Sequence, residues 1–187
     1  MELDGMHILF LVGPGFEDLE FWVPLMRLQE AGADVIVAGI SGRETYRGKS
    51  SLSATADIGF DDVNAKEYDG LVIPGGWAPD KIRRYDSVKR FVADFYHQGK
   101  VIGMICHAGL VGISAGIVSG LEATSSEGIK DDLENAGATW KNLPALRSRN
   151  VVWGRVVADI PDFCRELVNA FSEYKSAEQA SVISKKI

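Results

Sequence analysis

The chain has 187 residues, 46% of them hydrophobic and 25% charged, and a formal net charge of −6. This balance is typical of one globular domain and excludes a mainly disordered or fibrous protein. No apolar run reaches the roughly 18 residues of a membrane span, and no basic patch indicates nucleic-acid binding, so we expect a small-molecule partner.

Apolar strand patterns alternate with helical patterns along the whole chain. The expected elements, in chain order, are strands at 7–12 and 35–39 separated by a helix at 17–31, a β hairpin or edge strand within 43–57, strands at 68–73 and 100–105 separated by a helix at 86–98, helices at 107–117 and 129–136, a hairpin or edge strand at 151–157, and a last helix at 161–174. The alternation predicts an α/β fold with a mostly parallel sheet and helices on both faces. We expect one domain over 6–174, with peripheral extensions at 1–5 and 175–187.

The strand at 100–105 runs directly into Cys106 and then into a helix of small residues. This order resembles a nucleophile elbow, although Met104 stands where such elbows prefer glycine. Free N–H groups at the helix start would favour a thiolate, so we expect the Cys106 pKa to fall from ~8.5 into the ~3.5–7.5 range. His107 would lie beside the sulfur, either as a base or as the cation of a thiolate–imidazolium pair. The alternative is a helix-start histidine bound to some carboxylate.

A second loop, Pro74-Gly75-Gly76-Trp77, follows the strand at 68–73. In a doubly wound sheet, this loop and Cys106 would share the carboxyl edge, where ligands bind. The Gly76 and His107 N–H groups would then form an oxyanion hole; the alternative is a plain turn.

The first strand is followed by Gly13-Pro14-Gly15 and then by three acids. A dinucleotide site is rejected, because the third glycine is missing and the acids would repel phosphates. The helix dipole accounts for Glu17 and Asp18. Glu20, one turn further, would face the sheet edge and either hydrogen-bond the Cys106 thiol or be protonated beside the thiolate.

The two cysteines and three histidines show no spacing typical of a zinc site, so we expect no metal and no cofactor. Lone cysteines without an export signal indicate reduced thiols and a cytoplasmic protein. Cys164 lies in an apolar helical stripe and is expected to be a buried structural thiol.

With these segments in order, the chain resembles the DJ-1/PfpI superfamily, in its branch of PfpI-type intracellular proteases and deglycases. The similarity covers about residues 6–174 and rests on five segments: GFEDLEFWVPLMRLQEAG, LVIPGGWAPD, VIGMICHAGLVGISAG, SSEGIKDDLENAGATW and VVWGRVVAD. It implies a flavodoxin-like three-layer sandwich that forms dimers or larger rings. Class I glutamine amidotransferases share the elbow, but their catalytic histidine comes late, and here no histidine follows His107.

The resemblance assigns Cys106 as nucleophile, His107 as its neighbouring histidine, Glu20 as the buried glutamate and Gly76 as the oxyanion-loop glycine. Asp80 matches the acid, usually glutamate, that reaches across a subunit interface to the histidine. Trp77 would narrow the pocket mouth, or else form an interface contact.

Two functions follow as hypotheses. The first is a cysteine-dependent enzyme acting on small dicarbonyls such as methylglyoxal, on their protein adducts, or on peptide bonds. The second is a redox sensor or stress protein whose Cys106 oxidises to a sulfinate. An adjacent histidine and the acid at Asp80 favour the enzyme, because a sensor needs neither.

Overall fold

The computed structural model describes the backbone of residues 1–184 and the side chains of residues 1–181. Its centre is a seven-stranded sheet in the order β10-β11-β7-β6-β1-β2-β5. Every neighbouring pair is parallel except β10 with β11. The strands are β1 (His7–Leu11), β2 (Asp34–Gly39), β5 (Ile58–Gly59), β6 (Gly70–Ile73), β7 (Val101–Ile105), β10 (Ala145–Ser148) and β11 (Val151–Gly154).

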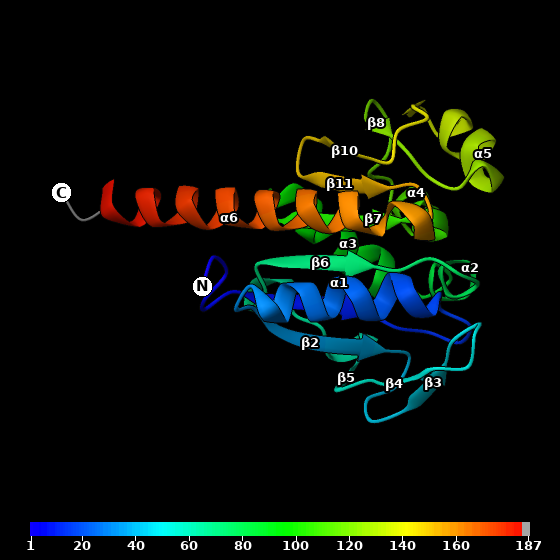
Figure 1. Cartoon of the computed structure of the whole chain (residues 1–187), viewed down its shortest axis with the longest axis horizontal. Coiled ribbons are helices and arrows are strands. Elements are labelled where there is room, and N and C mark those ends of the chain that lie inside the picture. Colours follow the sequence, from blue (N-terminus) through cyan, green and yellow to red (C-terminus); the bar gives the residue numbers. More distant parts are fainter. Residues whose placement is uncertain (185–187) are drawn as a thin grey trace.

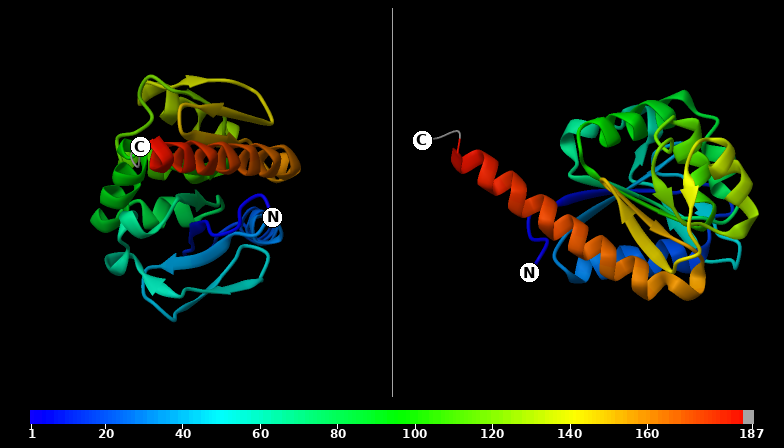
Figure 2. Two further views of the ribbon diagram at one scale, coloured as in Figure 1. Left: turned by 90° about the vertical axis from the view of Figure 1, so that its left-hand side faces the viewer. Right: turned by 90° about the horizontal axis from the view of Figure 1, so that it is seen from above.

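Helices cover both faces of this sheet, as Figures 1 and 2 show. One face carries α1 (Asp18–Glu30) and α6 (Ile160–Ser184), and the other carries α3 (Asp86–His97) and α4 (Gly109–Ser114). The smaller elements are α2 (Ala78–Ile82), α5 (Lys130–Asn135), the hairpin of β3 (Thr45–Arg47) with β4 (Ser53–Thr55), and the pair β8 (Glu122–Ala123) with β9 (Thr139–Trp140). The predicted three-layer α/β sandwich is confirmed.

The strand order identifies where a ligand site belongs. The five main parallel strands, taken in chain order, are arranged 2-1-3-4-5, which is the flavodoxin-like order. In such a sheet the order reverses between the first and third strands, here β1 and β6, and a crevice opens at their carboxyl ends. The loops that follow β1 and β6 therefore occupy the switch point.

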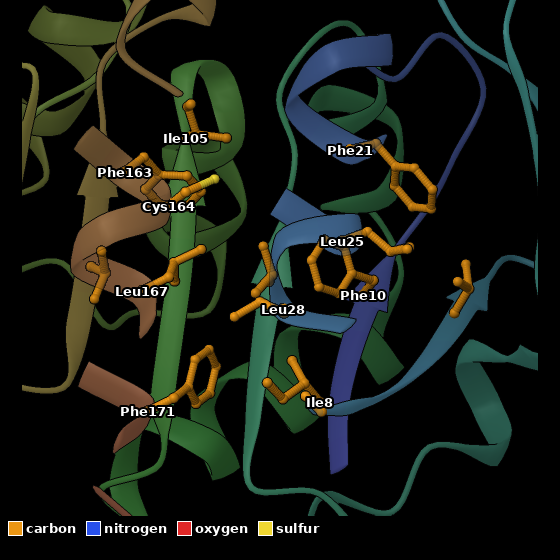
Figure 3. Packing of buried hydrophobic residues seen from close by; sticks show 14 of the residues in the cluster. Ile8, Phe10, Phe21, Leu25, Leu28, Ile105, Phe163, Cys164, Leu167 and Phe171 are labelled. Carbon is orange, nitrogen blue, oxygen red and sulfur yellow. The ribbon is translucent and has the colours of Figure 1, made fainter. Parts of the chain in front are cut away.

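The face covered by α1 and α6 is packed with large apolar side chains (Figure 3). Phe163, Leu167 and Phe171 of α6 recur at helical spacing, and all three are fully buried. Phe21 of α1 meets Phe10 of β1 edge-on, with ring centroids 5.8 Å apart. Each fully buried side chain of this size stabilises the fold by roughly 1.5–3 kcal/mol. This packing fixes the first turn of α1 against the carboxyl end of β1.

The boundaries of several elements differ from the predicted ones. The helix expected at 107–117 is a 3-10 turn at Cys106–Ala108 followed by a shorter α4. The last helix continues ten residues beyond the predicted end at 174, to Ser184. β11 is an inner strand paired with β7 as well as β10, so the edge belongs to β10.

The predicted peripheral extensions have different surroundings. Leu3 is fully buried in the core, and its N–H donates to the Ala31 carbonyl at 2.9 Å, so the first five residues contribute packing. At the other end, residues 175–184 belong to α6, and residues 185–187 lie outside the described residues. None of the described helices has the length and apolarity that crossing a membrane requires.

Candidate active site

Two glycine-containing loops are joined at the switch point of the sheet. Phe16, after β1, forms an antiparallel bridge with Gly76, after β6. The Glu17 N–H donates to the Gly75 carbonyl at 3.1 Å, and the Trp77 N–H donates to the Gly15 carbonyl at 2.8 Å. These hydrogen bonds hold the first turn of α1 and the loop before α2 at fixed positions on either side of Cys106.

Cys106 lies at a tight bend between β7 and the 3-10 turn. Its φ is +61°, a left-handed conformation that L-residues adopt at a cost of roughly 1–2 kcal/mol. Adjacent side chains diverge in a regular helix, but this bend brings the Cys106 Sγ within 3.2 Å of the His107 Nδ1. The predicted elbow geometry, and the contact between the two residues, are present.

Two backbone N–H groups point at the sulfur, those of His107 and Gly76, and each lowers the Cys106 pKa. Gly76 has a φ of +80°, and a Cβ there would lie 2.5 Å from the Gly15 carbonyl oxygen, so only glycine fits. The structure thus brings together the two donors expected to form an oxyanion hole.

Glu20 is fully buried directly beside the sulfur. Its Oε2 accepts the Gly75 N–H at 2.9 Å. A Cβ on Gly75 would lie 2.5 Å from this oxygen and 2.7 Å from the Cys106 Cβ, so the glycine permits the close approach. Burial, reinforced by the charge of Glu17 and opposed by the Gly75 hydrogen bond, raises the pKa of Glu20 from 4.5 to about 7.

The expectation of a lowered thiol pKa is wrong for this geometry. Burial, followed by the negative charge of Glu20, raises the pKa of Cys106 to about 12. The two amide donors lower it without overcoming these effects. The α4 helix has only six residues and begins three residues after the cysteine, so its end offers little dipole stabilisation to the thiolate.

His107 is suited to accept the thiol proton. Burial, assisted by the positive charge of Lys49, lowers the pKa of its imidazole below 6.5. Near neutral pH the pair is therefore a thiol beside a neutral imidazole, and not a thiolate beside an imidazolium. In this state Nδ1 can take the proton as the sulfur attacks an electrophile.

A cavity of about 590 Å³ opens beside Cys106 and His107, a size that fits a small ligand. We call it the Cys106 cavity; its remaining lining residues are Glu17, Glu20, Lys49, Gly76, Trp77, Asp80, Lys81, Leu110, Val156, Val157 and Ala158. One wall is apolar, and the mouth carries charges of both signs. Trp77 lines the cavity and is 61% exposed.

Asp80 lies at the mouth of this cavity and not beside His107. Within the chain, its Oδ2 accepts a hydrogen bond from the Arg84 Nη2 at 2.6 Å. The second ring nitrogen of His107, Nε2, faces Gly128: a Cβ built on this glycine would lie 3.3 Å from Nε2. The single chain therefore holds the cysteine, the histidine and the oxyanion donors together, and leaves Asp80 apart from them.

Sequence reasoning missed Lys49 and Lys81, both of which line the cavity, and it missed a second role of Asp18. Asp18 lies in the first turn of α1, as the dipole argument requires, and its side chain also accepts the N–H groups of Ser50 and Leu52 at 2.8 and 2.7 Å. No local pattern links residue 18 with a loop more than thirty positions away, so only the folded chain reveals the contact.

Neither cysteine forms a disulfide, and Cys164 is buried at 6% exposure in the α1–α6 core, as predicted. Across the part of the chain that the structure describes, no group of three or more histidine, cysteine or acidic side chains has the arrangement of a metal site.

Comparisons with known proteins identify relatives of this chain. The model of the DJ-1/PfpI family matches residues 6–170. A Pyrococcus horikoshii protein named a deglycase is 40% identical over 163 residues, covering 87% of this chain and 98% of that protein. A Bacillus subtilis protein named as a candidate cysteine protease is 34% identical and covers 87% of this chain and 96% of its own length. A solved two-domain protein from Anabaena variabilis, with DJ-1/ThiJ/PfpI-like and ferritin-like domains, is 34% identical with a TM-score of 0.86, covering 88% of this chain and 47% of that chain.

Proposed function

Because the chain belongs to the DJ-1/PfpI family, we propose that it is a cysteine-dependent enzyme acting on small electrophilic carbonyl compounds, as a deglycase or methylglyoxal-consuming enzyme. The observation that carries the proposal is the 3.2 Å contact between the Cys106 Sγ and the His107 Nδ1, inside a cavity that also receives the Gly76 and His107 amides. The deglycase name of the Pyrococcus horikoshii relative supports the same reaction class.

In the proposed chemistry, Cys106 is the nucleophile and His107 the base. As the sulfur forms a bond to the carbonyl carbon, its proton passes to the His107 Nδ1, and the carbonyl π electrons move to oxygen. The Gly76 and His107 N–H groups then stabilise the oxyanion, a contribution of roughly 3–4 kcal/mol per donor in other enzymes. Burial raises the pKa of Glu20 to about 7, so below this pH most molecules carry an uncharged carboxyl beside the sulfur, which opposes the developing thiolate less than a carboxylate would.

Among the residues whose side chains the structure describes, no acid is hydrogen-bonded to the His107 ring, and this leads to a proposal about assembly. Asp80 is exposed at the cavity mouth, and the Nε2 of His107 points away from the sulfur. We infer a homodimer or larger homo-oligomer in which Asp80 of a second copy reaches His107. Asp80 is one methylene shorter than the usual glutamate, so this contact requires a closer approach of the two copies.

Peptide hydrolysis is the second candidate within the same chemistry, and the name of the Bacillus subtilis relative favours it. The exposed indole of Trp77 at the mouth of a cavity of about 590 Å³ leaves room for a small aldehyde or a side-chain adduct more readily than for a folded polypeptide. The redox-sensor alternative is weaker, because peroxide oxidises thiolates and the buried Cys106 thiol holds its proton.

Replacement of the nucleophile tests the proposal. We expect Cys106→Ser to abolish methylglyoxal consumption while the oligomer, measured by size-exclusion chromatography with light scattering, stays unchanged. Cys164→Ala is the matched control, since it removes the other thiol, which does not line the cavity, and it should retain turnover. Turnover that persists in Cys106→Ser would remove the cysteine mechanism.

A further inference from the structure

Lys49 is a cation to which the proposed chemistry assigns no bond-forming or proton-transfer step, yet it lines the Cys106 cavity. Its Nζ is 5.6 Å from the centroid of the Trp77 ring and 3.5 Å from the Glu17 Oε2. The lysine side chain is 37% exposed, so its ammonium faces both the cavity and solvent. A ligand bound at Cys106 would therefore meet this charge.

The loop that carries Lys49 is held in place by hydrogen bonds to the buried Asp18 carboxylate and to the backbone. Asp18, only 2% exposed, accepts the N–H groups of Ser50 and Leu52. Gly48 permits this approach, because a Cβ there would lie 2.5 Å from the Asp18 Oδ2. The Lys49 N–H itself donates to the Phe16 carbonyl at 2.9 Å. The loop also contains Ser51 at a φ of +83°, a strained conformation that persists only where the surroundings enforce it.

The other charges at the mouth are engaged by their neighbours. Asp80 is paired with Arg84 at 2.6 Å, and the Lys81 Nζ donates to the Pro14 carbonyl at 3.2 Å. An ammonium has three N–H donors, so Lys49 and Lys81 each keep donors for a further anion. What separates them is position: Lys49 lies beside the Trp77 ring and acts on the charges of the site, whereas Lys81 is not among the groups that shift the pKa values of His107 and Glu20. The charge of Lys49 also lowers the pKa values of His107 and Glu20, which places it within electrostatic reach of the reacting atoms.

We propose that Lys49 is an anion-recognition residue, which binds the carboxylate or phosphate group of a carbonyl compound or adduct whose reactive carbon lies at Cys106. Asp18 is its positioning residue, because it fixes the loop from which Lys49 projects. This inference rests on the proposed function and narrows its substrate class: compounds that carry an anionic group near the carbonyl react faster than neutral ones of the same size.

Alkylation of Cys106 tests the recognition step without requiring any catalytic turnover. Iodoacetate and iodoacetamide differ only in carrying a carboxylate or an amide; with each, sulfur bonds to the methylene carbon, iodide leaves, and the thiol proton passes to His107 or solvent. The readout is the ratio of the iodoacetate rate to the iodoacetamide rate at Cys106, from peptide mass spectrometry, divided by the same ratio for a small free thiol. We expect this normalised ratio to exceed 1.

The charge variants carry opposite predictions. Lys49→Met should lower the ratio about fivefold, the size of a partly exposed ion pair. Glu17→Gln should raise it, because the competing carboxylate is removed, and Asp18→Asn should lower it by loosening the loop. Lys81→Met is the matched control and should change the ratio less than twofold. A wild-type ratio at or below 1, or an equal loss in Lys49→Met and Lys81→Met, would overturn the assignment.

A second assay tests the substrate class itself. Methylglyoxal hemithioacetals of N-acetylcysteine and of its uncharged amide give the carboxylate comparison, and methylglyoxal adducts of guanosine monophosphate and guanosine give the phosphate comparison. We expect a higher kcat/KM for the anionic member of at least one pair, and a preference that falls about fivefold in Lys49→Met. Equal rates within both pairs would overturn the substrate class while leaving the proposed function intact. If the wild type consumes neither adducts nor free methylglyoxal, the proposed function itself fails, and the substrate class falls with it.

Discussion

Replacing Glu20 by glutamine should make the protein more stable at alkaline pH, because Glu20 is an acid buried where its charge is unfavourable. Burial raises its pKa from 4.5 to about 7, which corresponds to about 3 kcal/mol of free energy against the ionised form in the folded state. A raised acid pKa means that the folded state holds the proton more tightly than the unfolded chain. The associated stability is complete below pH 4.5 and is lost as the pH rises through about 7.

Glutamine imitates the protonated carboxyl, since its amide oxygen can still accept the Gly75 N–H. We therefore expect the difference in unfolding free energy between Glu20→Gln and wild type to move in favour of the variant by about 3 kcal/mol between pH 4.5 and pH 8.5. The buried amide NH2 group of glutamine can lower the unfolding free energy of the variant by an amount that does not depend on pH. This amount drops out when the difference between variant and wild type at pH 8.5 is compared with the difference at pH 4.5.

Urea unfolding at a series of pH values, followed by circular dichroism, measures this difference. Glu134→Gln, which replaces an exposed carboxyl on α5, is the control and should show the same pH dependence as wild type. If Glu20→Gln and wild type differ by a constant amount across the range, the carboxyl ionises in the folded state as it does in the unfolded chain. Our account of the charge beside the sulfur would then be wrong.

Two further predictions address the base and the N-terminus. The acid limb of the pH profile of kcat/KM for methylglyoxal should have its midpoint below pH 6.5, the ordinary pKa of histidine, because burial and the charge of Lys49 lower the pKa of His107. A midpoint above pH 6.5 would contradict a base that is neutral near neutral pH. Leu3→Ala should reduce the unfolding free energy, measured by urea unfolding, by about 3 kcal/mol, because it leaves a cavity in the core. The control Leu52→Ala, at a side chain half exposed to solvent, should reduce it by under about 0.5 kcal/mol. A loss below about 1 kcal/mol for Leu3→Ala would show that residues 1–5 are dispensable.

The parts of this structure that were predictable are those encoded by neighbouring residues. Continuous apolar runs located β1, β2, β6 and β7 to within one or two residues, because burial on both faces leaves no polar alternation. The inner strand β11 was predicted as a hairpin or edge strand three residues too long. The elbow at Cys106 and the loop at Gly76 were also predictable from neighbouring residues, since each is a short pattern in which a strand runs into a turn.

The parts that were not predictable depend on pairs of residues far apart in the chain. The pKa of Cys106 is raised by Glu20, 86 positions earlier, and the placement of Lys49 depends on Asp18. The end of the last helix was missed for a different reason. Residues 175–184 have little apolar periodicity, and they are helical as the continuation of a helix already nucleated against the core.

The protonation of this site bears on how its chemistry would be controlled. Because burial raises the pKa of Cys106 to about 12 and the neighbouring imidazole is neutral, we expect the thiol of the resting protein to react slowly with peroxide. Attack becomes favourable only when an electrophile occupies the cavity, because the negative charge then develops on an oxygen held by the Gly76 and His107 amides and not on the buried sulfur. The same burial that opposes a standing thiolate therefore links activation of Cys106 to the presence of a carbonyl, which is what an enzyme requires and a peroxide sensor does not.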